Sequence, residues 1–274
     1  MPSSVSDPAS MRMFLTPKWW LSHLFVATML VVMTAAGFWQ LDRLSERRAS
    51  NDEIRAASEA DPVPVEQALD RVAAGETVLD HTAVTVRGTF RSDLGFLVAN
   101  RTFDTQPGSW LAAPMELDDG RLIIVSRGWV PRRWVVGDDP RSADPPTGTV
   151  VIEGRLFESI DGGRIGTGTD TLAEVSRMEL ETVEEALGVD LADRWVQLSE
   201  PQAAFGEIPV PVPPPNLNDG PHLSYAFQWF FFTVSTVVAY GLIFRHRLRD
   251  ARIEDQALLD LSGQAEESGV RSEN

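Results

Sequence analysis

The sequence predicts an α+β membrane protein in which two transmembrane helices flank one β-rich domain, barrel-like or sandwich-like, with a few short helices. Residues 19–41 and 222–244 each run for 23 residues without Asp, Glu, Lys or Arg. A helix of that length reaches about 34 Å, which spans a hydrocarbon core of about 30 Å. The 180 residues between them contain short segments of alternating apolar and polar residues, which are typical of β-strands.

The first apolar segment is predicted to be an uncleaved anchor preceded by a polar cytoplasmic leader, residues 1–18. A cleaved signal peptide is the alternative, since small residues occur at Ala35 and Ala36. However, an apolar run of 23 residues is longer than the usual signal core, and the Phe38-Trp39-Gln40 that follows is a poor cleavage context. Residues 44–60 lack Gly and Pro, so we expect the helix to continue beyond the membrane until Pro62.

Residues 42–207 are predicted to form one domain that begins with this helical extension. Strands are expected at 82–90, 95–103, 110–117, 121–129, 150–158 and 195–199. The Asp118-Asp119-Gly120 sequence predicts a tight turn between the third and fourth of them. A short helix is expected at 65–74. Residues 172–187 are expected to contain a second helical segment, with Met178, Leu180, Val183 and Leu187 at near-helical spacing and Gly188 at its end.

The domain is followed by a proline-rich strut, residues 208–221, with Pro at 209, 211, 213, 214 and 215. Such a run favours polyproline II and a semi-rigid connection. After the second span, residues 245–274 form a tail that is first basic and then acidic, and we expect its last dozen residues to be disordered.

Composition excludes several classes of function. The net charge is −16, and residues 42–221 alone hold 17 Arg against 32 Asp and Glu, so we expect no nucleic acid partner. The absence of cysteine excludes disulfides, thiol nucleophiles, iron-sulfur clusters and thiolate metal sites. The four histidines are too far apart in sequence for two of them to share one turn of a helix. We therefore expect no metal site apart from a single-histidine iron ligand, which is considered below.

Basic residues at the membrane ends predict the orientation. The second span is followed at once by four arginines, at 245, 247, 249 and 252, whereas no Lys or Arg lies between Arg194 and that point. This predicts cytoplasmic termini and an extracytoplasmic domain, in a bacterial plasma membrane. The first span has the opposite bias, with Arg12 and Lys18 before it and four arginines soon after it. We give more weight to the second span because long acidic domains cross a membrane largely regardless of charge.

Four segments together carry a resemblance to a known family. They read Gly37-Phe-Trp39-Gln40-Leu-Asp-Arg43-Leu, Gly108-Ser-Trp-Leu-Ala-Ala-Pro114-Met, Arg127-Gly128-Trp129-Val130-Pro131 and His222-Leu-Ser-Tyr225-Ala-Phe-Gln228-Trp229-Phe. In this order, and between two membrane spans, they resemble the Surfeit locus 1 family. Within that family, the resemblance is to bacterial members of the actinobacterial type. The resemblance covers most of residues 19–247. It implies an assembly factor for haem-copper cytochrome c oxidase, which docks on oxidase subunits in the lipid bilayer and takes part in the insertion of haem a.

The resemblance directs attention to six residues near one end of the two spans: His222, Tyr225, Trp229, Trp39, Gln40 and Arg43. An imidazole can ligate haem iron, an arginine can pair with a propionate, and aromatic rings can pack on the macrocycle. His23 cannot be a second ligand, because it lies about 25 Å from His222 if both helices span the membrane. The alternative is an ordinary interfacial aromatic belt with His222 in a polar headgroup contact.

The Arg127-Gly128-Trp129-Val130-Pro131 segment has two interpretations. It either docks a partner, or it is a strand end in which Trp129 packs and Pro131 terminates the ladder. At the level of the whole protein, the preferred hypothesis is a non-enzymatic assembly factor. The alternative is a stoichiometric accessory subunit of the oxidase or of a respiratory supercomplex. An enzyme is disfavoured because no Ser-His-Asp grouping or Gly-x-Ser-x-Gly motif occurs.

Overall fold

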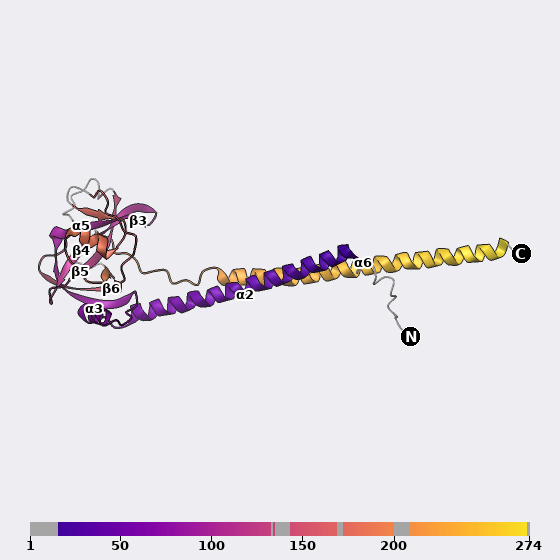
Figure 1. The fold of residues 1–274 in the computed structure, drawn as a ribbon, viewed down its shortest axis with the longest axis horizontal. Coiled ribbons are helices and arrows are strands. Elements are labelled where there is room, and N and C mark those ends of the chain that lie inside the picture. Colours follow the sequence, from indigo (N-terminus) through magenta and orange to yellow (C-terminus); the bar gives the residue numbers. More distant parts are fainter. Residues whose placement is uncertain (1–15, 133, 135–142, 169–171, 200–208, 273–274) are drawn as a thin grey trace. The chain divides into compact units, whose positions relative to one another are not determined.

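The computed structural model describes residues 16–132, 134, 143–168, 172–199 and 209–272 (Figure 1). It divides into two compact units, one formed by residues 1–49 and 219–274 and the other by Ser50–Asn218. The elements confirm the predicted α+β class, because two long apolar helices flank a β-rich domain that also contains short helices.

The first unit is a pair of helices, α2 (Pro17–Glu59, of which residues 50–59 belong to the second unit) and α6 (His222–Ser272). They pack antiparallel in this unit, since the start of α6 meets the middle of α2 and Tyr240 meets His23. Gly37 permits the closest approach: a Cβ there would lie 2.7 Å from Cε1 of Phe230. The continuous helix to Glu59 confirms the predicted extension beyond the first span. Both helices are long and apolar enough to cross a membrane.

The second unit is built around one sheet of eight strands in the order β1-β2-β6-β8-β5-β4-β3-β7. The strands are β1 (Val63–Pro64), β2 (Thr82–Phe90), β3 (Phe96–Phe103), β4 (Gln106–Leu117), β5 (Leu122–Pro131), β6 (Thr149–Phe157), β7 (Ala173–Val175) and β8 (Trp195–Leu198). An additional antiparallel pairing joins β2 to β4 and closes the five strands from β2 to β4 into a barrel. Closure removes the open edges that those strands would otherwise expose.

Alternation of side chains along β2 and its neighbours fills the barrel with aliphatic residues, including Val84, Val86 and Ile123. Helix α3 (Val65–Ala73) covers one end of this core with Val65, Ala68 and Leu69. A second core, under helix α5 (Leu180–Leu187), contains mainly residues from β3, β4, α5 and β8. The expected turn at Gly120 is present, with φ of 87°.

The predicted helical segment is confirmed in the second half of residues 172–187, and the first half contains a strand that was not predicted. Residues Ala173–Val175 form β7, which pairs in parallel with β3, and α5 begins only at Leu180. The near-helical spacing that predicted this helix arises because Met178, Leu180 and Val183 all enter the core under α5. Gly188 ends α5 in the left-handed conformation, with φ of 69°, as predicted.

The tail also differs from the prediction, because α6 is continuous to Ser272 and the expected disorder of the last dozen residues is wrong for residues 263–272. Ala, Leu, Glu, Gln and Arg dominate residues 251–272, and these residue types have high helix propensity. The prediction of disorder rested on the charged, Gly- and Ser-containing composition of the tail. It did not consider that extending an existing helix is easier than starting a new one.

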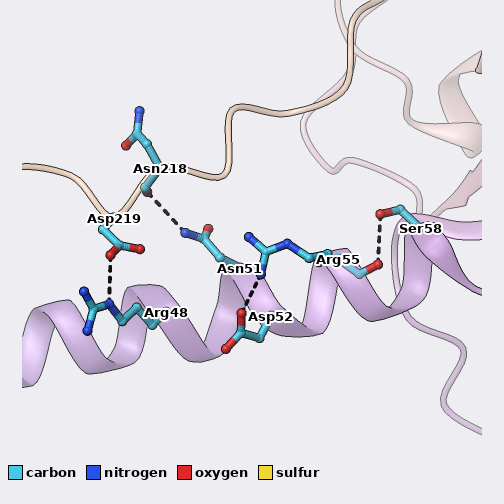
Figure 2. A network of polar contacts seen from close by, with 7 residues as sticks. All are labelled: Arg48, Asn51, Asp52, Arg55, Ser58, Asn218 and Asp219. Atoms are coloured by element: carbon cyan, nitrogen blue, oxygen red, sulfur yellow. Dashed lines mark hydrogen bonds and ion pairs between the residues drawn. The ribbon is translucent and has the colours of Figure 1, made fainter.

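The strut carries no regular element after Val210, and polar contacts fix it within each unit (Figure 2). In the second unit, the amide of Asn51 donates to the carbonyl of Asn218 at 3.2 Å, and Asn51 is buried. In the first unit, Nε of Arg48 donates to Asp219 at 2.8 Å. Figure 2 also shows the ion pair of Arg55 with Asp52 on α2, at 2.6 Å. The end of the strut is therefore tied to α2 by two hydrogen bonds, one within each unit.

Candidate functional site

The strongest candidate site in the helix pair is centred on His222, the first residue of α6. Its Nδ1 lies 2.9 Å from Oε1 of Gln40, and the ring is half-buried. An amide oxygen only accepts hydrogen bonds, so Nδ1 carries the proton in this arrangement. The acceptor nitrogen Nε2 is then the atom of this ring that could bind a metal. It lies beside Gly220, where a Cβ would come within 3.5 Å of Nε2. A glycine at this position keeps the approach to Nε2 open.

The other predicted residues of this site surround the pair without closing over it. Arg43 lies with its Cζ 5.9 Å from the Trp39 ring and pairs with Glu46 at 2.6 Å. Trp39 is 55% exposed and Tyr225 is 48% exposed, so both rings face outward from the helix pair. Trp229 is half-buried, whereas Ala226 is the residue of α6 that packs against α2 near His222.

Tyr225 lies three residues after His222 and outside the packed face of α6. The packed face of α6 contains His222, Ala226 and Phe230, each four residues from the next, because the small Ala226 and the pocket at Gly37 admit close packing. The structure brings His222 and Gln40 into direct contact and places Trp39, Arg43 and Tyr225 on exposed surface around them.

The opposite end of the helix pair carries a second polar contact. The hydroxyl of Tyr240 is hydrogen-bonded to Nδ1 of His23, and the two rings meet edge to face with centroids 5.8 Å apart. Seventeen residues separate His23 from Gln40 along α2, which corresponds to about 25 Å of helix. His23 and His222 therefore belong to separate sites, as the sequence predicted.

The Arg127-Gly128-Trp129-Val130-Pro131 segment lies inside the second unit and ends β5. Arg127 is 2% exposed; its Nη1 donates to the carbonyl of Ala143, and its Cζ lies 5.9 Å from the Phe90 ring. Leu111 pairs with Gly128 and Ala112 with Ser126, so Arg127 is the extra residue of a β-bulge. Burial lowers the pKa of Arg127 to about 10, while the charge of Asp144 raises it. The guanidinium therefore stays protonated at neutral pH.

The neighbouring residues of this segment bind the strut. Trp129 and Val210 exchange both backbone hydrogen bonds, at 2.6 and 2.8 Å. Gly128 has φ of 144°, and a Cβ there would lie 2.4 Å from the carbonyl oxygen of Val210. Trp129 is 6% exposed, and β5 ends at Pro131. All of these contacts favour the structural interpretation of the segment and leave little of it accessible to a partner.

Sequence reasoning missed a polar cluster in the second unit. Arg101, on β3, has its Cζ 4.4 Å from the ring centroid of Trp110, on β4. Burial lowers the pKa of Arg101, and so does the positive charge of Arg177. Trp110 stood in one of the quoted motifs, but no sequence signal links Arg101 to Arg177, because they are 76 residues apart.

Within the described ranges, no group of three or more His, Asp or Glu side chains is arranged to hold a metal ion. Several acidic groups of the second unit are instead paired with basic side chains or accept from backbone N–H groups. Asp119 and Asp70 pair with Arg121, for example, and Glu158 pairs with Arg194. The half-buried imidazole of His222 is thus the most promising single ligand among the described residues.

Comparison with known proteins agrees with this architecture. The model of the SURF1 family matches residues 27–234, a stretch that includes most of the first apolar segment, the whole β-rich unit and the start of the second apolar segment. Uncharacterized SURF1-like proteins of Mycobacterium bovis and Mycobacterium tuberculosis are each 28% identical over 244 residues, which cover 88% of this chain and 88% of theirs. A SURF1-like protein of Rickettsia bellii is 24% identical over 233 residues, 81% of this chain and 90% of its own.

The chain has one candidate membrane helix before a closed β-barrel and one after it, and the second helix begins with a histidine. These features define a class of proteins with two candidate spans and one β-rich domain. Within that class, the chain belongs to the SURF1 family.

Proposed function

We propose that the protein is an assembly factor for haem-copper cytochrome c oxidase that docks on oxidase subunits within the membrane. The family match carries this proposal, because it includes part of each long helix and the whole domain between them. Exposed apolar side chains on α2 and α6, such as Leu24, Phe227 and Phe231, supply a surface suited to lipid and to the helices of a membrane complex. The function is one of binding and positioning, and the chain itself carries out no reaction.

The proposed topology is that of a bacterial plasma membrane protein with cytoplasmic termini and an extracytoplasmic β-rich domain. The natural absence of cysteine makes this easy to test, since a single introduced cysteine is the only reactive thiol. Asp118→Cys lies at an exposed turn of the domain, with 61% of the native side chain accessible. A membrane-impermeant maleimide should label it in intact spheroplasts. Labelling only after the membrane is broken would place the domain in the cytoplasm and overturn the topology.

The proposal includes transient binding of haem a at the start of α6. His222 would ligate the iron through Nε2, Gln40 would hold the ring by accepting from Nδ1, and Arg43 would pair with a propionate. Trp39, Tyr225 and Trp229 would pack against the macrocycle. When bound, haem a is the redox group that the oxidase requires. The open approach to Nε2 beside Gly220 supports this arrangement, while an interfacial aromatic belt remains the competing interpretation of the three rings.

The proposed function is tested by deleting the gene in cells that make haem a and restoring it as wild type or as His222→Ala. Deletion should lower the amount of haem a bound in membranes and the oxidase activity, while the wild type restores both. His222→Ala should fold and insert normally but restore less oxidase. If the deletion strain assembles a normal amount of oxidase, the proposed function is wrong. If deletion lowers the oxidase but His222→Ala restores it as fully as the wild type does, only the haem site is wrong.

The amount of this chain in purified oxidase distinguishes an assembly factor from a permanent subunit. Quantitative mass spectrometry of active oxidase, or of a respiratory supercomplex that contains it, should find far less than one copy per complex. A value near one copy would favour the alternative of a stoichiometric accessory subunit.

A further inference from the structure

We propose that Arg101 and Arg177, with Trp110 as a supporting platform, form a receptor for a carboxylate carried by an acidic side chain of a protein partner. Three neighbouring strands bring these residues together in the second unit. β3 carries Arg101 and lies between β4, which carries Trp110, and β7, which ends two residues before Arg177. The choice of a protein as the carrier rests on the proposed docking function, whereas the recognition of an anion rests on the geometry alone.

Within the part of the chain that the structure describes, neither arginine is paired directly with a carboxylate, although the charge of Arg177 also acts on Glu179 and lowers its pKa. Among the described residues, neither Arg101 nor Arg177 forms an ion pair, although the chain as a whole has a net charge of −16. Nε of Arg101 is buried and has no hydrogen-bond partner within that part of the chain. Arg177 donates only to a backbone carbonyl, that of Asp161, at 3.0 Å. An incoming anion would relieve both the repulsion between the guanidinium groups and the lack of a partner.

The platform beneath Arg101 is held rigidly. The Trp110 ring lies 6.2 Å from that of Trp195, which is buried and stacked on Phe157 at 4.7 Å. The backbone of Arg101 is fixed by Trp129, whose Nε1 donates to the Arg101 carbonyl at 3.0 Å. A receptor whose groups are already in place loses little conformational entropy when a ligand binds.

Two of the sequence motifs converge on this platform. Gly108 comes directly before Ser109 and Trp110 on β4, and a Cβ at Gly108 would lie 2.5 Å from the Trp129 indole. The Gly108-Ser109-Trp110 segment and the Arg127-Pro131 segment are therefore packed against each other at the position where Arg101 is held. Their buried residues act as positioning residues, and the half-buried Arg101 is the group that they hold in place.

The available donors match a carboxylate better than a phosphate. Protein phosphate sites commonly use adjacent backbone N–H groups, and the pair of this kind near Arg177 belongs to Gly162 and Gly163. Both N–H groups already donate to the carboxylate of Glu179, each at 2.9 Å. An incoming anion therefore meets side chains only. A planar guanidinium offers two parallel N–H donors, which match the two oxygens of a carboxylate.

The proposal is tested by titrating the full chain, in nanodiscs of zwitterionic lipid, with a hexaglutamate peptide and following tryptophan fluorescence and heat. Arg101→Gln should weaken binding at least tenfold, and Arg177→Gln several-fold. Arg87→Gln is the matched control, because Arg87 is exposed on β2 and already paired with Asp118 at 3.0 Å. It should bind as the wild type does. Inorganic phosphate and vesicles containing phosphatidylglycerol, titrated separately, should bind weakly and without dependence on Arg101.

Hexaglutamate binding that is absent in the wild type, or unchanged in both arginine variants, would overturn the receptor. Phosphate or anionic vesicles that bind more tightly than hexaglutamate in an Arg101-dependent way would overturn the assignment to an acidic protein segment. Arg177 is exposed, so Arg177→Gln tests the site even if Arg101→Gln fails to fold. The titrations contain no oxidase, so their failure would not contradict the proposed function. Normal oxidase assembly in the deletion strain would, in turn, not contradict the carboxylate receptor.

Discussion

Two motifs of this chain differ in where they place their polar side chains. The segment at the end of β5 buries its arginine at 2% exposure, and its glycine and tryptophan contact backbone atoms of the strut and of β3. The second motif is formed where the start of α6 meets the middle of α2. It keeps Trp39 and Tyr225 about half exposed and uses one hydrogen bond, between Gln40 and His222, to join the helices. Both motifs carry the family resemblance. Burial therefore separates residues that specify the fold from residues that remain available to a ligand or partner.

The largest effect expected from this comparison is that of Gly128→Ala. The new Cβ would overlap the Val210 carbonyl, and φ of 144° is unfavourable for alanine. We expect the domain to lose about 2 to 4 kcal/mol of unfolding free energy, measured by urea-dependent proteolysis of the protein in detergent. Gly120→Ala is the control, because Gly120 also has a positive φ but no atom within 4 Å of the added Cβ; it should lose about 1 kcal/mol. If Gly128→Ala and Gly120→Ala lost the same unfolding free energy, the close contact of Gly128 with Val210 would have no special importance for stability.

Gln40→Leu, where α2 meets the start of α6, is expected to affect stability less than Gly128→Ala does. Its effect on function is expected to be larger. The variant removes the acceptor that orients His222, which should reduce helix-pair stability by only about 0.6 kcal/mol. If His222 binds haem a, affinity should fall by a factor of about 10 or more, because the ring loses its orienting partner. Spectral titration of the purified protein with haem a measures this. Gln228→Leu, at an exposed position on α6, should leave affinity unchanged. A loss of stability without a change in haem affinity would show that the pair serves packing alone.

The smallest expected effect is a dependence of domain stability on pH that comes from Glu179 and not from the buried Arg127. A hydrogen bond from Thr182 and others from the N–H groups of Gly162 and Gly163 lower the pKa of Glu179. Its stabilising contribution is therefore present above the pKa of the unfolded chain and is lost as pH falls through the lower pKa of the folded state. The melting temperature should decline as the pH is lowered from about 5 to 3, and Glu179→Gln should make that decline shallower.

Arg127 should contribute no slope in that pH range. Its folded pKa of about 10 lies below that of the unfolded chain, so burial of the charge lowers stability at every pH below 10 by a constant amount. The unfavourable contribution would be relieved only as pH rises above 10. A pH-dependent decline between 5 and 3 that is identical in Glu179→Gln would assign the slope to other carboxylates.

Local patterns in the sequence were sufficient to predict most elements of the fold. The bounds of β2 were predicted correctly at Thr82–Phe90, because nine residues alternate between the barrel interior and the outside. The prediction failed for β7, because three residues that add in parallel to a distant strand have no local signal. The hairpin between β3 and β4 was also missed. Its turn residues Asp104 and Thr105 have φ of 45° and 63°, and threonine is rarely found in that conformation.

The site was predicted less completely than the fold, because burial depends on register. Helical spacing placed His222 and Gln40 at a similar depth, and the structure joins them. Spacing could not decide that Ala226, and not Tyr225, would face α2, since that choice depends on which side chain fits the space left by Gly37. The β-bulge at Arg127 depends on one extra residue in β5, and the proximity of Arg101 to Arg177 depends on strand order.

The bridge between Val210 and Trp129 has a mechanical consequence. Tension applied to the chain from the C-terminal side reaches these two backbone hydrogen bonds before any strand of the described sheet. These two hydrogen bonds would break first under tension, while the strands of the barrel remain paired. In a pulling experiment on the tethered protein, we would expect a short first extension as the strut detaches, followed at higher force by the rupture of β8.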